Sequence, residues 1–274
     1  MGRRRTERVL VTRVTGEPGA RSAGRRPDEL IVEEPMSIQL DGTLVSTTMR
    51  TPGHDHELAA GFCLTEGLLA GAPVTGVRYC ADGSALDTAF NVVTVETGGR
   101  APTPTPRLGT TSSSCGWCGS EQLDDLCGRL APLAPPSAID LDVLASVPDR
   151  VRAAQGLFTS TGSVHAAAAF DADGEVLAVR EDVGRHNAVD KLVGAMALGA
   201  AGLPPLPATG LGLFVSGRAS IEMVQKAWAA GFSSLVAVSA PTALAVDAAR
   251  RANLVLAGFV RGGEFNVYAP ERLP

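Results

Sequence analysis

The order of hydrophobic and polar positions divides the chain into two parts with different element patterns. In the first part, residues 37–40 and 43–45 are short alternating runs that flank Asp41 and Gly42. Glycine tolerates the positive φ of a tight turn, so this pattern predicts a β-hairpin. Further along, the spacing predicts one helix and two strands, over residues 55–69, 74–79 and 90–96. The first part is therefore predicted to be a small α+β unit.

From residue 165 onward, strand-like runs alternate with helix-like runs. Strands are predicted over residues 165–170, 176–179, 211–215, 235–238 and 254–260. Helices are predicted over residues 187–198, 221–230 and 243–251. Such alternation is typical of a mainly parallel or mixed sheet with helices on its faces. We therefore predict an α/β protein, with a layered α/β C-terminal half and a smaller N-terminal α+β half.

Composition shifts suggest where these parts begin and end. Residues 1–27 mix Arg, Gly, Glu and Pro without sustained periodicity, so we expect a flexible basic tail. A stretch rich in Pro, Thr and Ser precedes the middle of the chain, and it predicts an extended connector. The expected division is an N-terminal subdomain, a connector with a cysteine loop and a C-terminal subdomain, over residues 28–100, 101–120 and 121–274. Together they form one integrated unit, residues 28–274.

The overall composition narrows the classes of function. With 274 residues, 45% hydrophobic and 19% charged, the chain can bury a substantial core. The net charge of -5 gives no global attraction to nucleic acid, and no apolar run reaches the ~20 residues of a membrane-spanning helix. Basic residues 3–5 are not followed by the apolar stretch of an export signal. We expect a cytoplasmic protein that binds neither nucleic acid nor membrane.

Two of the five cysteines form a pair that suggests chemistry. Cys115 and Cys118 lie in the sequence Ser-Ser-Ser-Cys-Gly-Trp-Cys-Gly. Thiols at this spacing can share a proton, close a disulfide or pass a sulfur atom between them. The acidic, helix-like run that begins at Glu121 places Cys118 near a helix N-terminus, which favours the thiolate. The remaining cysteines are predicted to be small buried hydrophobic residues: Cys63, Cys80 and Cys127.

A second group of candidate residues follows the ends of predicted strands. The loops over residues 216–220, 239–242 and 261–264 are rich in Ser, Gly and Ala. Small residues let the backbone approach a ligand, helix N-terminal amides favour anions, and Arg218 and Arg261 add bidentate donors. The three loops together indicate a phosphate-bearing or nucleotide-like ligand. Neither a P-loop nor a dinucleotide-binding fingerprint is present.

Residues 181–191 form the densest polar cluster in the sequence, between a predicted strand and a predicted helix. A helix cap with solvated charges is the simplest interpretation. However, Lys191 and Lys226 are the only lysines among 24 basic residues, which suggests that an ammonium group is needed at these two places. His186 is a candidate for ligand contact or proton transfer, whereas His165 fits a core histidine equally well.

Five motifs in a fixed order carry a family resemblance. They cover residues 115–119, 161–167, 181–191, 216–220 with Glu222 and Lys226, and 259–268. In this order, over about residues 29–273, they resemble the FdhD family of formate dehydrogenase accessory sulfurtransferases. An ordered series of motifs is far more specific than a paired-cysteine pattern alone.

The resemblance implies a function, a fold and a set of site residues. The function is a cytoplasmic, dimeric sulfurtransferase that accepts sulfur as a persulfide from a cysteine desulfurase. It passes this sulfur to the molybdenum cofactor, bis(molybdopterin guanine dinucleotide), which formate dehydrogenase requires. The implied fold is similar to that of cytidine deaminases. The persulfide position falls on Cys115, with Cys118 as its partner. The cofactor-contacting stretch falls on Phe259, Val260, Arg261, Gly262, Gly263 and Glu264.

One position departs from the family pattern. Some relatives place a basic residue near the end of the cofactor-contacting stretch, where this chain has Glu264. An acidic side chain is a poor contact for an anionic ligand, so Arg261 is expected to supply most of the attraction. Pyrophosphate groups of a guanine dinucleotide also suit the strand-end loops, and Arg218 and His186 complete the predicted binding residues.

Three other functions are compatible with parts of the sequence. A zinc-dependent deaminase-like enzyme would need a Pro-Cys-x-x-Cys pair and an H-x-E element. Here Ser114 precedes the first cysteine, and Glu57 directly follows His56. A thioredoxin-like oxidoreductase uses a C-x-x-C pair, but there the pair follows a buried strand and not a Ser-rich connector. A non-catalytic chaperone that shields the cofactor would not need the cysteines for its activity.

Overall fold

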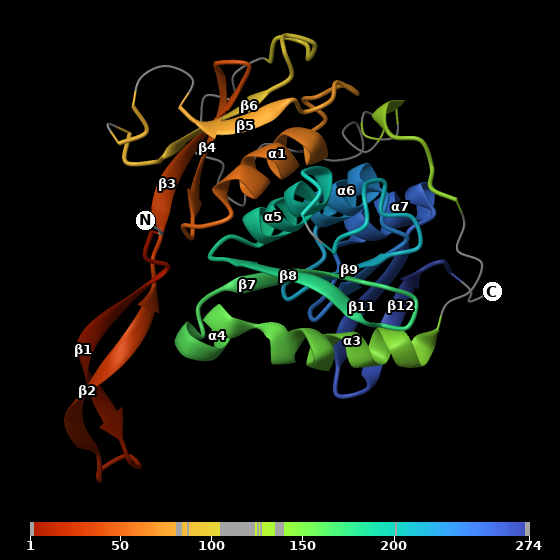
Figure 1. Cartoon of the computed structure of the whole chain (residues 1–274). Helices are drawn as coiled ribbons and strands as arrows, with labels where there is room; N and C mark the ends of the chain where they lie inside the picture. Colours follow the sequence, from red (N-terminus) through yellow and green to blue (C-terminus); the bar gives the residue numbers. More distant parts are fainter. Residues whose placement is uncertain are drawn as a thin grey trace.

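The computed structural model describes residues 3–80, 84–86, 88–104, 124, 126, 128–134, 140–200 and 202–271. Within these residues the strands form a two-stranded hairpin, a four-stranded sheet and a six-stranded sheet. Figure 1 shows the hairpin projecting from the body, with the small sheet at one end of a stack and the large sheet below it. The fold is therefore a layered α/β body that carries an N-terminal arm.

The arm is the antiparallel pair β1 (Thr6–Thr15) and β2 (Ser22–Ile31), paired in register from Thr6 opposite Ile31 to Thr15 opposite Ser22. This differs from the expected tail over residues 1–27. Valine and threonine recur along β1, and Gly16 and Gly19 adopt the positive φ that reverses the chain between the strands. The many arginine and glycine residues had hidden this strand pattern.

The small sheet confirms the predicted hairpin. β3 (Glu34–Leu40) and β4 (Thr43–Arg50) are joined by Asp41 and Gly42, which both have positive φ as a type I′ turn requires. β5 (Gly76–Tyr79) and β6 (Val92–Glu96) complete the order β4-β3-β6-β5. Helix α1 (Asp55–Thr65) packs on this sheet through Leu58 and Phe62, and it ends four residues before the predicted boundary.

The large sheet has the order β12-β11-β10-β9-β7-β8. Its strands are β7 (His165–Phe170), β8 (Val176–Asp182), β9 (Gly212–Val215), β10 (Ser234–Ala237), β11 (Val255–Arg261) and β12 (Glu264–Ala269). The pairs β9–β10 and β10–β11 are parallel, and the outer pairs are antiparallel. The prediction of a mixed sheet in an α/β protein is confirmed, and β12 is a strand that the pattern did not predict.

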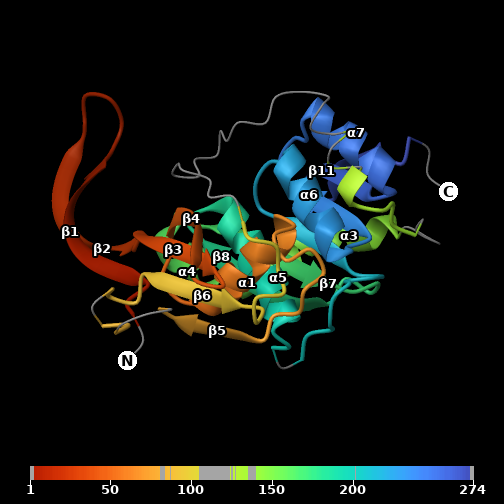
Figure 2. The ribbon, with the colours of Figure 1, turned by 90° about the horizontal axis from the view of Figure 1, so that it is seen from above.

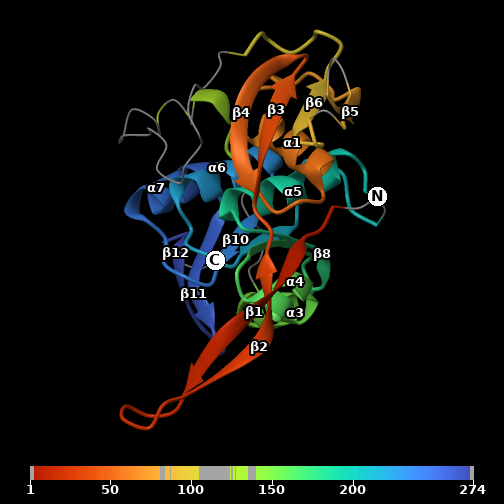
Figure 3. The ribbon, with the colours of Figure 1, turned by 90° about the vertical axis from the view of Figure 1, so that its left-hand side faces the viewer.

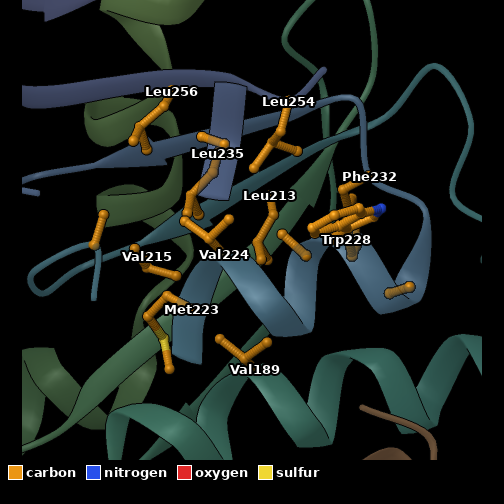
Figure 4. Close-up of a cluster of buried hydrophobic side chains, with 14 of the residues drawn as sticks. Val189, Leu213, Val215, Met223, Val224, Trp228, Phe232, Leu235, Leu254 and Leu256 are labelled. Carbon is orange, nitrogen blue, oxygen red and sulfur yellow. The ribbon is translucent and has the colours of Figure 1, made fainter. Parts of the chain in front are cut away.

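Helices cover both faces of the large sheet. On one face lie α5 (Arg185–Ala197), α6 (Ile221–Ala230) and α7 (Ala243–Ala252). On the other face lies α3 (Leu141–Ala154), which is followed by the short α4 (Gly156–Thr161). Successive strand residues point to opposite faces: Leu213 packs towards α6, and Phe214 packs towards α3. Figure 4 shows Leu213 beside Val224 and Trp228 of α6.

The two halves of the body meet where α1 crosses α5. A Cβ atom on Gly61 would overlap the carbonyl oxygen of Asp190, and one on Gly194 would overlap the carbonyl oxygen of Glu57. Only glycine permits this approach of two helix backbones. Seen from above, the small sheet lies over α1 and α5 (Figure 2). The stack thus runs from the small sheet through α1 and α5 to the large sheet and α3.

The predicted elements after residue 165 agree closely with the structure. The bounds of β7 and α6 match the predictions at both ends, and the other strands and helices differ by one to three residues. Helix α3 and the short α4 were not predicted, since Pro148 inside α3 interrupts the helical pattern. Residues 105–123, which include most of the predicted connector, lie outside the described residues.

Candidate ligand-binding edge of the large sheet

The loops that follow β9, β10 and β11 lie side by side. The backbone N–H of Ser239 donates to the carbonyl oxygen of Gly217 at 3.3 Å, and that of Ala219 donates to Ala240 at 3.2 Å. The N–H of Phe259 donates to Ser239 at 3.2 Å. Because the parallel strands end at one edge, their loops form a continuous backbone surface there. Hereafter this surface is called the binding edge, formed by residues 216–220, 239–242 and 259–264 with the N-terminal ends of α5 and α6.

Phe259 holds an unusual position on the binding edge. Its φ is 57°, a left-handed conformation that is rare for a bulky residue, and 40% of the residue is exposed. The pairing of β11 with β12 shifts register between Gly258 and Arg261, so the strand bulges at this point. Strained backbone of this kind concentrates at ligand-binding sites. Phe259 is therefore a partly exposed aromatic residue whose backbone lies beside Ser239.

The other residues of the predicted cofactor-contacting stretch fall into two groups. The side chain of Val260 is fully buried against α3, so only its backbone can meet a ligand. Arg261, Gly262, Gly263 and Glu264 are exposed at the turn between β11 and β12. This turn extends beyond the paired part of β10, on the same edge as the other loops.

Helix α5 brings Arg185 and His186 to the binding edge. A Cβ on Gly217 would lie 3.6 Å from the His165 ring and 3.9 Å from Cδ of Arg185, so these side chains line the loop after β9. His165 Nδ1 is 3.4 Å from the hydroxyl of Ser216. Arg185 directly precedes His186 but was not predicted as a site residue. Nothing in the sequence distinguishes it from the other arginines.

Three buried polar atoms at the binding edge have no hydrogen-bond partner among the described residues. They are Nε of Arg185, Oγ of Ser220 and Oε2 of Glu222. Ser220 is the N-cap of α6, yet its hydroxyl does not cap the helix, and α5 also lacks a side-chain cap at Gly184. Buried polar groups in proteins are nearly always paired, so these atoms and uncapped amides point to a ligand.

Three basic side chains at the binding edge have lowered pKa values. Burial and the nearby Arg218 lower the pKa of Arg185, against the opposing effect of Glu222. Burial, with Lys226 and Arg185 nearby, lowers the pKa of His186 to about 4. Burial and Arg185 also lower the pKa of His165. Both histidines are thus neutral at neutral pH, and the charge of the edge comes from its arginines.

The rest of the polar segment 181–191 is structural. Lys191 and Asp182 form a fully buried ion pair at 2.6 Å, and Lys191 also donates to the carbonyl oxygen of Thr51 at 2.8 Å. Asn187 donates to Asp182 at 3.0 Å and to the carbonyl oxygen of Met49 at 2.7 Å. These contacts join the end of β4 to α5. The interpretation of this segment as a cap with solvated charges is wrong for these residues.

A second buried pair joins α1, α5 and α6. Lys226 contacts both carboxylate oxygens of Asp190, at 2.8 and 3.0 Å, and Thr65 and Glu66 supply further partners at 2.9 and 3.1 Å. Burial opposes the charge on Lys226, but Asp190 and Glu66 outweigh it and hold its pKa above the usual value. The two lysines are therefore both used to connect the halves of the body. Neither has its ammonium group free for a ligand.

The structure describes two of the five cysteines. Cys115, Cys118 and Cys127 lie outside the described residues. Cys63 and Cys80 are buried, which confirms the prediction for these two. Burial, with Asp190 nearby, raises the pKa of the Cys63 thiol to about 12, so this thiol is a poor nucleophile.

The described residues also bear on the zinc and membrane alternatives. Among them, no cluster of three His, Cys, Asp or Glu side chains could hold a metal ion. His54 Nδ1 lies 3.0 Å from Oε2 of Glu57, and the His56 ring lies next to the Tyr79 ring at a tilt of 50°, with centroids 4.7 Å apart. No helix in this part of the chain has the length and apolar character needed to cross a membrane.

Fold and binding edge together define a mixed α/β protein with a candidate ligand-binding site at the carboxyl ends of parallel strands. The sequence model of the FdhD/NarQ family matches residues 31–273, and the chain belongs to this family. The family resemblance drawn from the five motifs is thereby confirmed.

Relatives and a solved structure extend this comparison. A relative from Streptomyces coelicolor, named sulfur carrier protein FdhD, is 49% identical over 273 residues, covering 96% of this chain and 94% of the relative. A protein of the same name from Mycolicibacterium paratuberculosis is 45% identical, covering 96% of each chain. A crystal structure from Desulfotalea psychrophila, described as that of a formate dehydrogenase accessory protein, superposes with a TM-score of 0.73. It is 23% identical and covers 97% of this chain, so it supports the fold.

Proposed function

We propose that this protein is a sulfur carrier that serves the maturation of formate dehydrogenase. The observation that supports this most strongly is the likeness, over almost the full length, to relatives named sulfur carrier protein FdhD. The likeness of 45–49% identity covers 96% of this chain, so it spans both halves of the body. The carrier role unites the binding edge and the cysteine segment in one molecule.

The substrate that accepts the sulfur is proposed to be the molybdenum cofactor, as bis(molybdopterin guanine dinucleotide). Its pyrophosphate groups suit the uncapped N-terminal amides of α5 and α6, with Arg218 and Arg261 as charged donors. The unpartnered Oε2 of Glu222 can accept from an N–H group, which a guanine base carries on its Watson–Crick edge. The exposed ring of Phe259 offers a surface for stacking. The donor and acceptor atoms of the edge therefore fit this ligand.

The proposed chemistry begins with sulfur uptake by Cys115 from a cysteine desulfurase. The Cys115 thiolate attacks the outer sulfur of the desulfurase persulfide, the S–S bond of that persulfide breaks, and the desulfurase thiolate leaves. The outer sulfur is now bonded to Sγ of Cys115. This exchange changes no net oxidation state, so it needs neither an oxidant nor a reductant.

Delivery is proposed to use the second cysteine. The Cys118 thiolate attacks Sγ of Cys115, and the outer sulfur leaves with its bonding electrons as sulfide, which the molybdenum atom accepts. The two cysteines are oxidised to a disulfide in this step, and a dithiol reductant returns them to thiols. In this scheme the protein is a sulfurtransferase that acts in the cytoplasm.

A cytidine-deaminase-like layering of the large-sheet half remains part of the proposal.

The test is complementation of a strain that lacks its own copy of the protein. Cys115→Ala should abolish formate dehydrogenase activity in cells, while the purified variant still binds GDP, a soluble stand-in for the guanine end of the cofactor. Cys63→Ala removes a thiol that is buried and poorly reactive, and it is the matched control that should support maturation. Normal maturation by Cys115→Ala would refute the carrier role and favour a chaperone that only shields the cofactor.

A further inference from the structure

The connection between β8 and α5 carries Arg185 and His186 to the binding edge. It consists of only two residues, Val183 and Gly184. Gly184 is the N-cap of α5, and no side chain caps the helix at this position. Nε of Arg185 has no hydrogen-bond partner among the described residues, so the place of this side chain depends strongly on the backbone that carries it. What holds the connection therefore bears on the binding edge.

Thr51, which directly follows β4 in the other half of the body, holds this connection. Its Oγ1 accepts from the backbone N–H of Val183 at 3.1 Å, and its own N–H donates to Oδ2 of Asp182 at 3.1 Å. Oδ1 of Asp182 accepts from the N–H of Gly184 at 2.8 Å. Both N–H groups of the connection are thus bound either by Thr51 or by the carboxylate that Thr51 contacts. Thr51 and Asp182 are fully buried, so water does not readily replace these bonds.

A second contact between the halves holds the first turn of α5 itself. Asn187 donates through Nδ2 to the carbonyl oxygen of Met49 and to Asp182, and its Oδ1 accepts from the hydroxyl of Thr48 at 3.2 Å. A Cβ on Gly184 would lie 2.9 Å from Nδ2 of Asn187, so the connection packs directly on this amide. Figure 3 shows β4 reaching from the small sheet to α5. The start of α5 is thus fixed by residues of the small half.

We propose that Thr51 is a positioning residue for the binding edge, which acts through the first turn of α5 on Arg185 and His186. The small half then contributes to ligand affinity from outside the edge. Without this grip, only a fraction of the molecules would hold the two side chains in the competent position, and the apparent Kd would rise by the inverse of that fraction. The ligand part of this inference rests on the proposed function, whereas the control of α5 by Thr51 does not.

Two substitutions separate the hydroxyl of Thr51 from its methyl group. Thr51→Val keeps the shape but leaves the buried N–H of Val183 unpaired, and Thr51→Ser keeps the acceptor and loses the methyl group. Thr97→Val is the matched control, because Thr97 is also fully buried in the small half and its hydroxyl accepts from the N–H of Ala101 at 3.0 Å. Thermal unfolding of the three variants gives the loss of stability against which the other measurements are compared.

The first measurement is the pKa of His186 by NMR titration, with His186→Gln identifying its signals. Burial, with Lys226 and Arg185 nearby, lowers this pKa to about 4 in the wild type. Loosening the first turn of α5 admits water to the ring, so the pKa should rise towards its usual 6.5 in Thr51→Val. Thr51→Ser and Thr97→Val should keep it at about 4. An unchanged pKa in Thr51→Val would overturn the proposal.

The second measurement is the Kd of GDP by calorimetry. Thr51→Val should raise this Kd about tenfold, as when about a tenth of the molecules remain competent. Thr51→Ser and Thr97→Val should leave it nearly unchanged. Arg185→Ala should cost less affinity in the Thr51→Val background than in the wild type, because both changes disturb one element.

The outcomes of the GDP titration separate this proposal from the proposed function. Equal losses of affinity in Thr51→Val and Thr51→Ser would point to general destabilisation and overturn the proposal. So would additive effects of Thr51→Val and Arg185→Ala. A wild-type chain that does not bind GDP, with a His186 pKa that still rises in Thr51→Val, would support the positioning role and refute the cofactor role of the edge.

Thr48→Val supplies the same test if Thr51→Val does not fold. It removes the hydroxyl that donates to Oδ1 of Asn187, in a partly buried contact, and Thr48→Ser is its conservative partner. The His186 pKa should be higher in Thr48→Val than in Thr48→Ser. Equal pKa values in this pair would overturn the proposal.

Discussion

Two polar regions meet at α5, and they differ in whether their buried groups have partners. At the junction of the two halves, Lys191 and Lys226 each contact a buried carboxylate and at least one further oxygen. At the binding edge, Arg185 and Glu222 keep buried atoms without a partner. Satisfied groups hold the fold together, and unsatisfied groups are available to a ligand. The same polar segment, residues 181–191, supplies both regions.

The largest expected effect is at the junction. Lys226→Met removes the cation that neutralises Asp190 inside the body, and an unpaired buried charge is costly. We expect the free energy of unfolding in urea to fall by about 3–5 kcal/mol. Pairing this change with Asp190→Asn should recover part of the loss, since it removes the stranded charge. A cost for Lys226→Met that is no larger than for a surface substitution would contradict the structural role of the pair.

The next effect in size is a pH dependence that arises at the binding edge. The pKa of His186 falls from its usual 6.5 to about 4 on folding. Between these two values the unfolded chain binds a proton that the folded chain does not, so stability must fall as pH decreases. The loss from pH 6.5 to 4 should be on the order of 2–3 kcal/mol. Urea unfolding across this range should show a shallower slope for His186→Gln than for the wild type, and identical slopes would contradict this assignment.

A smaller effect is expected where the two helices cross. Gly61→Ala places a methyl group against the backbone of Asp190, so α1 and α5 must move apart. Overpacking of this kind costs about 1–3 kcal/mol. Thermal unfolding measures the cost, with Gly156→Ala as the control, because a Cβ at this helical glycine meets nothing within 4 Å. Equal stabilities of the two variants would show that the junction is looser than the contact implies.

The smallest effect on stability is expected at the binding edge itself. Glu222→Gln keeps the size of a side chain whose Oε2 has no hydrogen-bond partner among the described residues, so unfolding should shift by less than ~0.5 kcal/mol. GDP affinity, measured by calorimetry, should nevertheless fall at least tenfold. Ser146→Ala, at a partly buried helix position on the opposite side of the sheet, is the control for GDP binding. Unchanged affinity in Glu222→Gln would remove this residue from the site.

Much of the fold could be predicted from residue patterns where the patterns were regular. β7 and α6 were placed with correct bounds because apolar alternation and helical spacing are uninterrupted there. Helix α3 was missed although Leu144, Val147 and Val151 follow a helical spacing and Asp140 caps its first turn. Pro148 and the Pro-rich stretch before the helix masked this signal. The arm was missed because its strands carry many charged and polar residues and gain little from burial.

The candidate site was only partly predictable. The strand-end loops rich in small residues do lie side by side, since parallel strands end at one edge. Ligand binding at this edge stays a prediction. The sequence alone could not assign Arg185 to the binding edge and Asp182 to the buried junction. Both lie in the same polar segment, and their roles depend on which partners the fold brings near them. Lysine scarcity did indicate that the two lysines are special, but their role proved to be internal ion pairing. Polar density alone therefore does not distinguish a ligand site from a structural junction.

The most direct test of the carrier role is intact-mass analysis after incubation with a cysteine desulfurase and cysteine, followed by peptide mapping. The account predicts a gain of one sulfur atom, located on the peptide that contains Cys115 and removed by a reductant. Cys63→Ala should gain the same mass, and Cys115→Ala should gain none. A wild-type protein that acquires no sulfur, or that acquires it only at another cysteine, would contradict the account.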